Sequence, residues 1–88
     1  MQIREIVSAK WLRGYEVELT FDTLEKGSVD LKPLIGRGVF KSLINTSEFK
    51  KFRVDAELGT IVWPNGADMA PHVLYDLAKK NFSSKKAA

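Results

Sequence analysis

The sequence contains no cysteine, and this absence removes several kinds of site at once. A chain without thiols forms no disulfide, holds no iron–sulfur cluster through cysteine and has no cysteine nucleophile. It also has a single histidine, His72. Because protein sites for zinc and other transition metals are built mainly from cysteine and histidine, we expect neither a metal site nor a cofactor.

Long apolar segments are also missing from the sequence. Its first residues, MQIREIVSAKW, lack the apolar core of a signal peptide, and no run approaches the roughly 20 apolar residues of a membrane-spanning helix. This predicts a cytoplasmic protein with no membrane partner. The 88 residues suffice for one domain. We expect that domain over residues 1–80 and a flexible basic tail over residues 81–88.

Positive charge is distributed unevenly along the chain. The formal net charge is +3, from 14 lysine and arginine residues and 11 aspartate and glutamate residues. Residues 32–53 carry six basic side chains and one acidic side chain, whereas residues 54–78 carry four acidic side chains and no lysine or arginine. Four lysines follow residue 78. Residues 1–78 are therefore almost neutral, and the high overall basicity is weak support for a nucleic-acid partner.

Alternating polar and apolar residues predict two groups of β-strands. Glu16–Phe21 is the clearest strand, because a period of two places its apolar residues on one face and its glutamates and threonine on the other. Residues 3–11 and 28–31 are predicted to complete an antiparallel meander with one wet face, with a turn at residues 25–27. Residues 52–63 predict a second hairpin.

Helical patterns follow each group of strands. A helical turn is predicted near Leu34, and then a helix that ends near Ile44. This helix buries a stripe formed by Val39, Phe40, Leu43 and Ile44. Two glycines, at positions 36 and 38, weaken its start.

Two further elements complete the predicted order. Thr46 or Ser47 is expected to cap a short turn that carries Phe49 inward, and a last helix is predicted from Pro71 to about Lys80. The order βββ-α-ββ-α, with hairpins too short for parallel crossovers, indicates an α+β fold with a mostly antiparallel sheet.

The most distinctive stretch is Trp63-Pro64-Asn65-Gly66-Ala67-Asp68, followed by Pro71 and Leu74-Tyr75. It is preceded by Phe49, Gly59-Thr60-Ile61 and Val62, and further upstream by Phe21, Gly27, Asp30 and Leu31. With these residues the chain resembles, over nearly its whole length, a family of short bacterial proteins catalogued as domain of unknown function twenty-four forty-two.

The resemblance implies a small α+β domain. Some relatives are fused to a helix-turn-helix DNA-binding domain or are encoded beside a small partner protein, in a manner similar to toxin–antitoxin pairs. The family has no established catalytic residues, so the resemblance transfers none to this chain. Because the sequence ends soon after the last predicted helix, we do not expect direct operator binding.

Two interpretations of the distinctive stretch are open. In one, Trp63 packs in the core while the polar residues build a turn between strand and helix, with Asp68 as a helix cap. In the other, one exposed recognition surface is formed by Trp63, Asn65, Asp68, His72 and Tyr75. We favour the structural interpretation, because a turn from strand to helix requires these residue types.

Catalytic arrangements have little support in the sequence. His72 would share a helix face with Asp68 and Asp76, but no second histidine completes a metal site. No serine lies in a Gly-x-Ser-x-Gly motif. Asp55 and Glu57 are more simply turn residues than a catalytic carboxylate pair. We therefore do not expect an enzyme.

Basic residues of the central segment offer a different kind of site. A candidate basic patch is formed by Lys32, Arg37, Lys41, Lys50, Lys51 and Arg53. Gly36-Arg37-Gly38 is interpreted as a break between two helical pieces rather than as an anion site. The phenylalanines at positions 40, 49 and 52 are expected to face the core, so stacking on nucleic-acid bases has little support.

The sequence thus predicts a binding or regulatory module that acts through protein–protein contact. Its partner is expected to be a small protein, as in a toxin–antitoxin-like gene pair, or a second copy of the chain. The alternative is an accessory protein that binds nucleic acid through the basic residues from Lys32 to Arg53. A third class, an enzyme, requires Asp68, His72 and Tyr75 to converge on one cleft.

Overall fold

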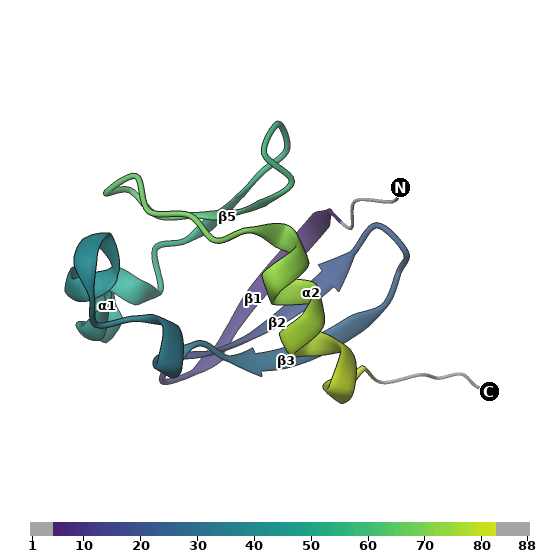
Figure 1. Ribbon diagram of the computed structural model, residues 1–88, viewed down its shortest axis with the longest axis horizontal. Helices are drawn as coiled ribbons and strands as arrows, with labels where there is room; N and C mark the ends of the chain where they lie inside the picture. The colour runs from purple at the N-terminus through teal and green to yellow at the C-terminus, as the bar shows by residue number, and fades with distance from the viewer. Residues whose placement is uncertain (1–4, 83–88) are drawn as a thin grey trace.

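The alternation in Glu16–Phe21 produces the middle strand of the main sheet (Figure 1). The computed structural model describes residues 5–82 of the chain. In it, β2 (Glu16–Phe21) lies between β1 (Ile6–Arg13) and β3 (Lys26–Asp30) and is antiparallel to both. The inward side chains of β2 are buried and the outward ones are half-buried. The predicted antiparallel meander with one solvent-exposed face is confirmed, although β1 ends at Arg13 rather than at Trp11.

The turn between β2 and β3 comes earlier in the chain than predicted. The amide of Leu24 donates to the carbonyl of Phe21 at 2.8 Å, and the amide of Phe21 donates to the carbonyl of Glu25 at 2.9 Å. The turn therefore occupies residues 21–25 rather than residues 25–27. It places Leu24 at a φ of 73°, a conformation that costs an L-residue with a side chain roughly 1–2 kcal/mol.

Helix α2 (Pro71–Ala78) packs against β3 and continues into a short 3₁₀ helix, η3 (Lys79–Asn81). Proline at the first position and two buried residues, Leu74 and Ala78, agree with the predicted helix. Among the described residues, no helix has the length and apolar character needed to cross a membrane.

Gly27 lies inside β3, where it allows α2 and the chain after it to come close. A Cβ atom at this position would lie 2.7 Å from the carbonyl oxygen of Ala78 and 2.9 Å from Cδ1 of Phe82. Phe82 forms a β-bridge with Gly27, and the Asn81 side chain donates to the carbonyl of Ser28 at 2.9 Å. Asn81 and Phe82, which the sequence places in the flexible tail, therefore contact β3, while the flexibility of the tail stays a prediction. The rest of the predicted tail lies outside the described residues.

The central helical segment consists of three short pieces: η1 (Lys32–Leu34), η2 (Gly38–Ile44) and α1 (Thr46–Phe49). The helical turn near Leu34 is confirmed, but η2 is a 3₁₀ helix and not the predicted α-helix. The two glycines at positions 36 and 38 have φ values of 104° and 52°. These left-handed conformations separate η1 from η2, which begins at Gly38.

The capping residue of α1 is also different from the prediction. Oδ1 of Asn45 accepts a hydrogen bond from the amide of Ser47 at 2.9 Å, so Asn45 is the N-cap instead of Thr46 or Ser47. Asparagine is among the best N-cap residues, because its side-chain oxygen satisfies an amide at the helix start. Phe49, at the end of α1, is buried as predicted.

The type of helix decides which side chains of η2 are exposed. Residues three apart eclipse each other in a 3₁₀ helix, so Phe40 and Leu43 share the inward side. Leu43 is buried and Phe40 is half-buried, whereas Val39 is 61% exposed and Ile44 is 53% exposed. The predicted stripe of four buried residues is therefore wrong for Val39 and Ile44.

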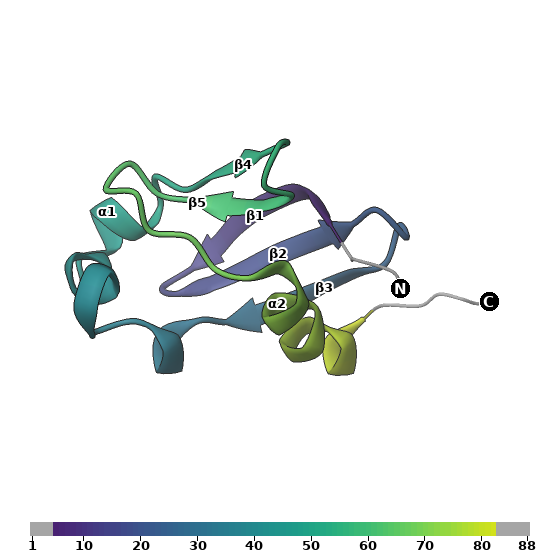
Figure 2. The same cartoon turned by 45° about the horizontal axis from the view of Figure 1, so that its top comes forward.

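The second hairpin pairs β4 (Arg53–Asp55) with β5 (Thr60–Val62). Residues 67–69 return along the other side of β5, through a β-bridge between Val62 and Asp68. Figure 2 shows this hairpin beside β1, at the edge of the main sheet opposite to β3. One hydrophobic core extends through both sheets and α2, so the described residues form the predicted α+β fold.

We predict that Gly27→Ala destabilises the fold. The new methyl group meets a backbone carbonyl that belongs to α2, so the helix has to move, at a cost of about 1–3 kcal/mol. Thermal unfolding measures this as a melting temperature lower by about 4–8 °C per kcal/mol. Ser28→Ala, one residue further along β3, is the control and changes little. An unchanged melting temperature for Gly27→Ala would contradict the close approach of α2.

We predict that Leu24→Gly stabilises the fold. Leu24 is 82% exposed, so its side chain contributes little packing, while its positive φ is costly. Glycine relieves the strain but loses more entropy on folding, and the net gain is about 0.5–1 kcal/mol. Leu58→Gly is the control, because Leu58 is also exposed and is not among the residues with positive φ. A lower melting temperature for both variants would show that Leu24 is unstrained.

Candidate functional site

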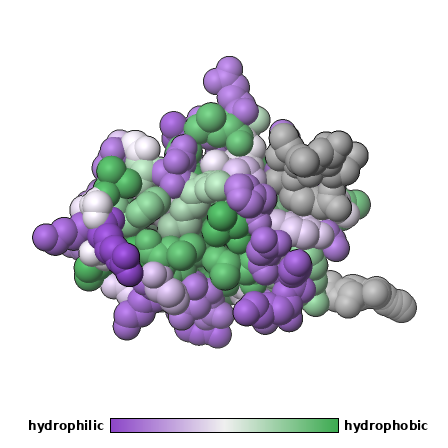
Figure 3. Space-filling view, viewed as in Figure 1, coloured by the Kyte–Doolittle hydropathy of each residue, from purple (hydrophilic) through white to green (hydrophobic). Residues whose placement is uncertain are grey.

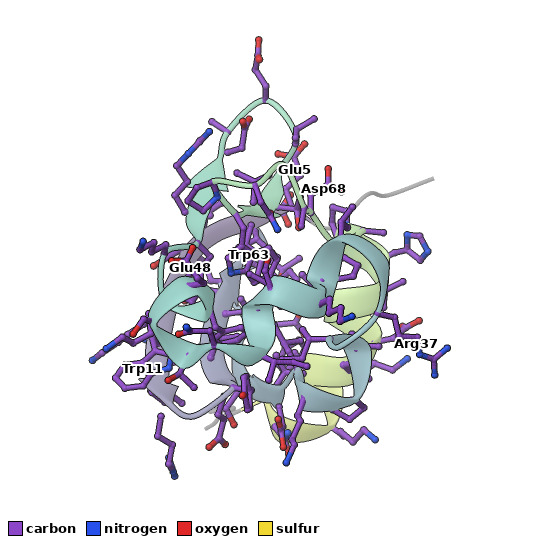
Figure 4. The ribbon with its side chains drawn as sticks, turned by 90° about the vertical axis from the view of Figure 1, so that its left-hand side faces the viewer. Glu5, Trp11, Arg37, Glu48, Trp63 and Asp68 are labelled. Carbon is purple, nitrogen blue, oxygen red and sulfur yellow. The ribbon has the colours of Figure 1, made fainter. Side chains whose placement is uncertain are left out.

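Trp63 belongs to the core and not to an exposed surface. Its side chain is 2% exposed, and its indole N–H donates to the carbonyl of Phe49 at 2.8 Å. The ring lies among three phenylalanines, with centroid distances of 5.8 Å to Phe49, 6.1 Å to Phe52 and 6.3 Å to Phe40. Figure 4 shows Trp63 near the centre of the molecule, behind the central helical segment. The structural interpretation is confirmed for this residue.

The turn after Trp63 has the hydrogen-bond pattern of a hairpin loop. The amide of Gly66 donates to the carbonyl of Trp63, and the amide of Trp63 donates to the carbonyl of Ala67, both at 2.9 Å. Gly66 has a φ of 92°, which its lack of a Cβ makes inexpensive. The β2–β3 turn repeats this pattern and places Leu24 where Gly66 stands here.

Asn65 ties this turn to η2. Its Oδ1 accepts from the amide of Ala67 at 2.9 Å, within the turn. Its Nδ2 donates to the carbonyl of Val39 at 2.9 Å and to Oγ of Ser42 at 3.1 Å, both in η2. Asn65 therefore acts as a structural link between the second hairpin and the central helical segment.

The remaining members of the predicted recognition surface differ in their exposure. The hydroxyl of Tyr75 donates to Glu25 at 2.9 Å, and its ring packs on Phe21 at 5.1 Å. Asp68 and His72 are exposed. The N-cap of α2 is Ala70, without a side-chain cap, so the expectation that Asp68 caps this helix is wrong.

His72 is exposed on α2, and its side chain belongs to no group of possible metal ligands within residues 5–82. Asp76, expected on the same helix face, pairs with Lys79 at 3.4 Å. No group of three or more histidine and acidic side chains within residues 5–82 is placed to hold a metal ion. Asp55 acts in the β4–β5 turn, where Oδ1 accepts from the amides of Glu57 and Leu58.

The six residues of the candidate basic patch do not form one surface. Lys51 pairs with Glu48 at 3.0 Å, and Arg53 pairs with Asp55 at 3.7 Å. Lys50 lies over the ring of Trp11, 4.7 Å from its centroid. Figure 4 shows Trp11 and Arg37 on opposite sides of the molecule.

Sequence reasoning missed the aromatic partner of Lys50. Trp11 is 36% exposed, and its indole N–H is held by the carbonyl of Gly14 at 2.9 Å. The expectation that no exposed aromatic accompanies the basic residues is therefore wrong at this position. The sequence shows Trp11 just before a turn at Gly14. It does not show the contact with Lys50, because the two residues lie far apart along the chain.

An apolar surface on another side of the molecule was also missed. Figure 3 shows apolar side chains gathered in the middle of one face, between the central helical segment and α2. From these elements, Leu34, Val39 and Val73 are exposed by 37%, 61% and 38%. Arg37 extends from the same side of the molecule (Figure 4). We call Leu34, Arg37, Val39 and Val73 the η2–α2 face.

We predict that Asn65→Asp destabilises the fold by about 1 kcal/mol. Aspartate keeps the acceptor for the amide of Ala67 but loses the donor to Val39 and Ser42. Asn45→Asp is a matched control, because the only side-chain hydrogen bond of Asn45 within the described residues is the one it accepts as an N-cap, which aspartate forms equally well. Urea unfolding compares the two variants. Equal free energies of unfolding would refute a structural role for the Asn65 amide.

The sequence was compared with known families, curated proteins and solved structures. Residues 6–80 match the family described as "Protein of unknown function (DUF2442)". No curated protein and no solved structure matches the chain. That residues 63–68 are the signature of this family stays a prediction. Since the match spans most of the 88 residues, the chain belongs to the DUF2442 family of proteins of unknown function.

Proposed function

We propose that this protein is a protein-binding module whose contact surface is the η2–α2 face. The observation that carries the proposal is the exposure of Leu34, Val39 and Val73, which come from η1, η2 and α2. Figure 3 shows an apolar area between the central helical segment and α2. Contiguous apolar surface costs free energy in water, and on small proteins it marks sites where another molecule binds.

The way polar side chains are used supports binding rather than catalysis. Asn65 and Asp55 hold turns, and the hydroxyl of Tyr75 is engaged by Glu25. Asp68 and His72 are exposed, whereas the hydroxyl of Tyr75 donates to Glu25 and its ring packs on Phe21. An enzyme is not part of the proposal.

The partner that we propose is a small protein encoded beside this one, as in a toxin–antitoxin-like gene pair. The bacterial and cytoplasmic setting predicted from the sequence belongs to this proposal. A small module with one exposed apolar face fits such a role, because binding a dedicated partner removes that face from water.

One observation favours a second candidate function, nucleic-acid binding. Lys50 and the half-exposed ring of Trp11 offer a cation beside an aromatic surface, which are the two components of single-strand recognition. Glu48 and Asp55 neutralise the neighbouring Lys51 and Arg53, so we rank this candidate second. Binding of a labelled oligonucleotide that weakens with salt and is lost in Trp11→Ala would support it.

We predict that this protein forms a complex with the product of the neighbouring gene and that Val39→Asp weakens the complex about tenfold. The substitution places a charge in the apolar contact but leaves the carbonyl of Val39, the acceptor for Asn65, unchanged. Leu24→Asp is the control, because it adds the same charge at an exposed leucine in the β2–β3 turn. Calorimetric titration of both variants measures the difference. If the wild-type proteins form no complex, the proposed function fails.

A further inference from the structure

We propose that the segment which binds the η2–α2 face is both acidic and apolar, a stretch of the partner protein in which carboxylates flank apolar side chains. The inference rests on the proposed function and specifies the chemistry of its partner. It follows from the charges around the face, from the placement of Arg37 and from the kinds of side chain that lie beside it.

The charged side chains of η1 and η2 are all basic. Residues 31–47, which include η1 and η2, contain Lys32, Arg37 and Lys41 and no acidic residue, whereas Asp76 on the α2 side is paired with Lys79. Within the described residues, none of these three cations forms an ion pair, whereas Arg13, Lys51, Arg53 and Lys79 each have a carboxylate at 3.0–3.7 Å. Cations that are not paired with a carboxylate of their own chain attract and orient a partner of opposite charge.

Arg37 is placed to contact such a partner at the edge of the apolar area. It lies between two glycines whose φ values are 104° and 52°, so the backbone turns sharply on both sides of it. Figure 4 shows its side chain extending away from the body of the molecule. A guanidinium offers two parallel N–H donors to a carboxylate, a geometry that lysine does not reproduce.

The side chains beside Arg37 favour a protein over a nucleic acid. Leu34, Val39 and Val73 are aliphatic and fit apolar side chains, whereas recognition of single strands uses aromatic rings on which bases stack. The nearest aromatic residue of η2, Phe40, is half-buried and faces Trp63. A phosphate backbone would satisfy the cations but would leave the apolar area exposed.

A second copy of the chain fits the face less well than a separate partner. The outer face of the main sheet carries Glu16, Glu18 and Asp30, but it offers polar and not apolar side chains. The β4–β5 turn does combine an acidic and an apolar residue, Glu57 and the 53% exposed Leu58. Glu57 and Leu58 supply one carboxylate and one aliphatic side chain, against three cations and three aliphatic side chains at the face, so docking of a second copy is kept as an outcome of the experiment.

The experiment measures the affinity for the neighbouring gene product at about 50 mM and about 300 mM NaCl, concentrations that differ strongly in electrostatic screening. We expect the wild-type dissociation constant to rise about tenfold at the higher salt, and Arg37→Glu to weaken binding about tenfold at the lower salt while reducing the salt dependence. Lys26→Glu is the matched control, because it makes the same change of charge on the outer face of the sheet. It should change the dissociation constant by less than about twofold.

The contrary results distinguish a failure of this inference from a failure of the proposed function. A complex that responds to Val39→Asp but not to Arg37→Glu or to salt leaves the proposed function standing and refutes an acidic segment. No complex at all refutes the proposed function and this inference with it. Two further results also refute the inference: binding of a labelled oligonucleotide that Arg37→Glu abolishes, or self-association in sedimentation that Leu58→Asp abolishes.

Discussion

The contacts of Trp63 and Asn65 hold the second hairpin and the central helical segment in one arrangement. The indole of Trp63 reaches the carbonyl at the end of α1, and the amide of Asn65 reaches the carbonyl of Val39 in η2. The central segment contains only short helical pieces, which have little stability of their own. Its position therefore depends on these contacts, and so does the exposure of Val39 on the η2–α2 face. In the proposed function, Trp63 and Asn65 position the contact surface and are not themselves part of it.

Much of the fold could be predicted from the sequence, because the main sheet obeys simple periodicity. The alternation in Glu16–Phe21 gave β2 its observed bounds, and the pattern after Pro71 located α2. The misplaced elements have a physical explanation. Over seven residues a 3₁₀ helix and an α-helix share most of their apolar spacing, so η2 was assigned the wrong period and Val39 the wrong side. Gly27 was assigned to a turn because close helix packing and tight turns both select glycine.

The candidate site was less predictable than the fold, because its residues come together only in three dimensions. The sequence left open whether Trp63 and Asn65 have a structural or a functional role. Their hydrogen bonds to the central helical segment show a structural role. The six basic residues were expected on one patch, but two of them are neutralised by acidic residues close in sequence. The cations that remain around the apolar area are distinguished by the absence of acidic residues in residues 31–47. The lack of acidic residues can be read from the sequence. Its relation to an apolar surface depends on the exposure of Val39, which only the structure shows.

The central claim is that a partner binds the η2–α2 face while the Trp63 turn serves as its support. Amide chemical shifts of the ¹⁵N-labelled protein, recorded with and without the neighbouring gene product, test this claim most directly. The account predicts that the largest changes fall on residues 34–44 and on the first two turns of α2, with small changes on β2 and β3. Changes concentrated on the outer face of the main sheet, around Glu16 and Glu18, would contradict it.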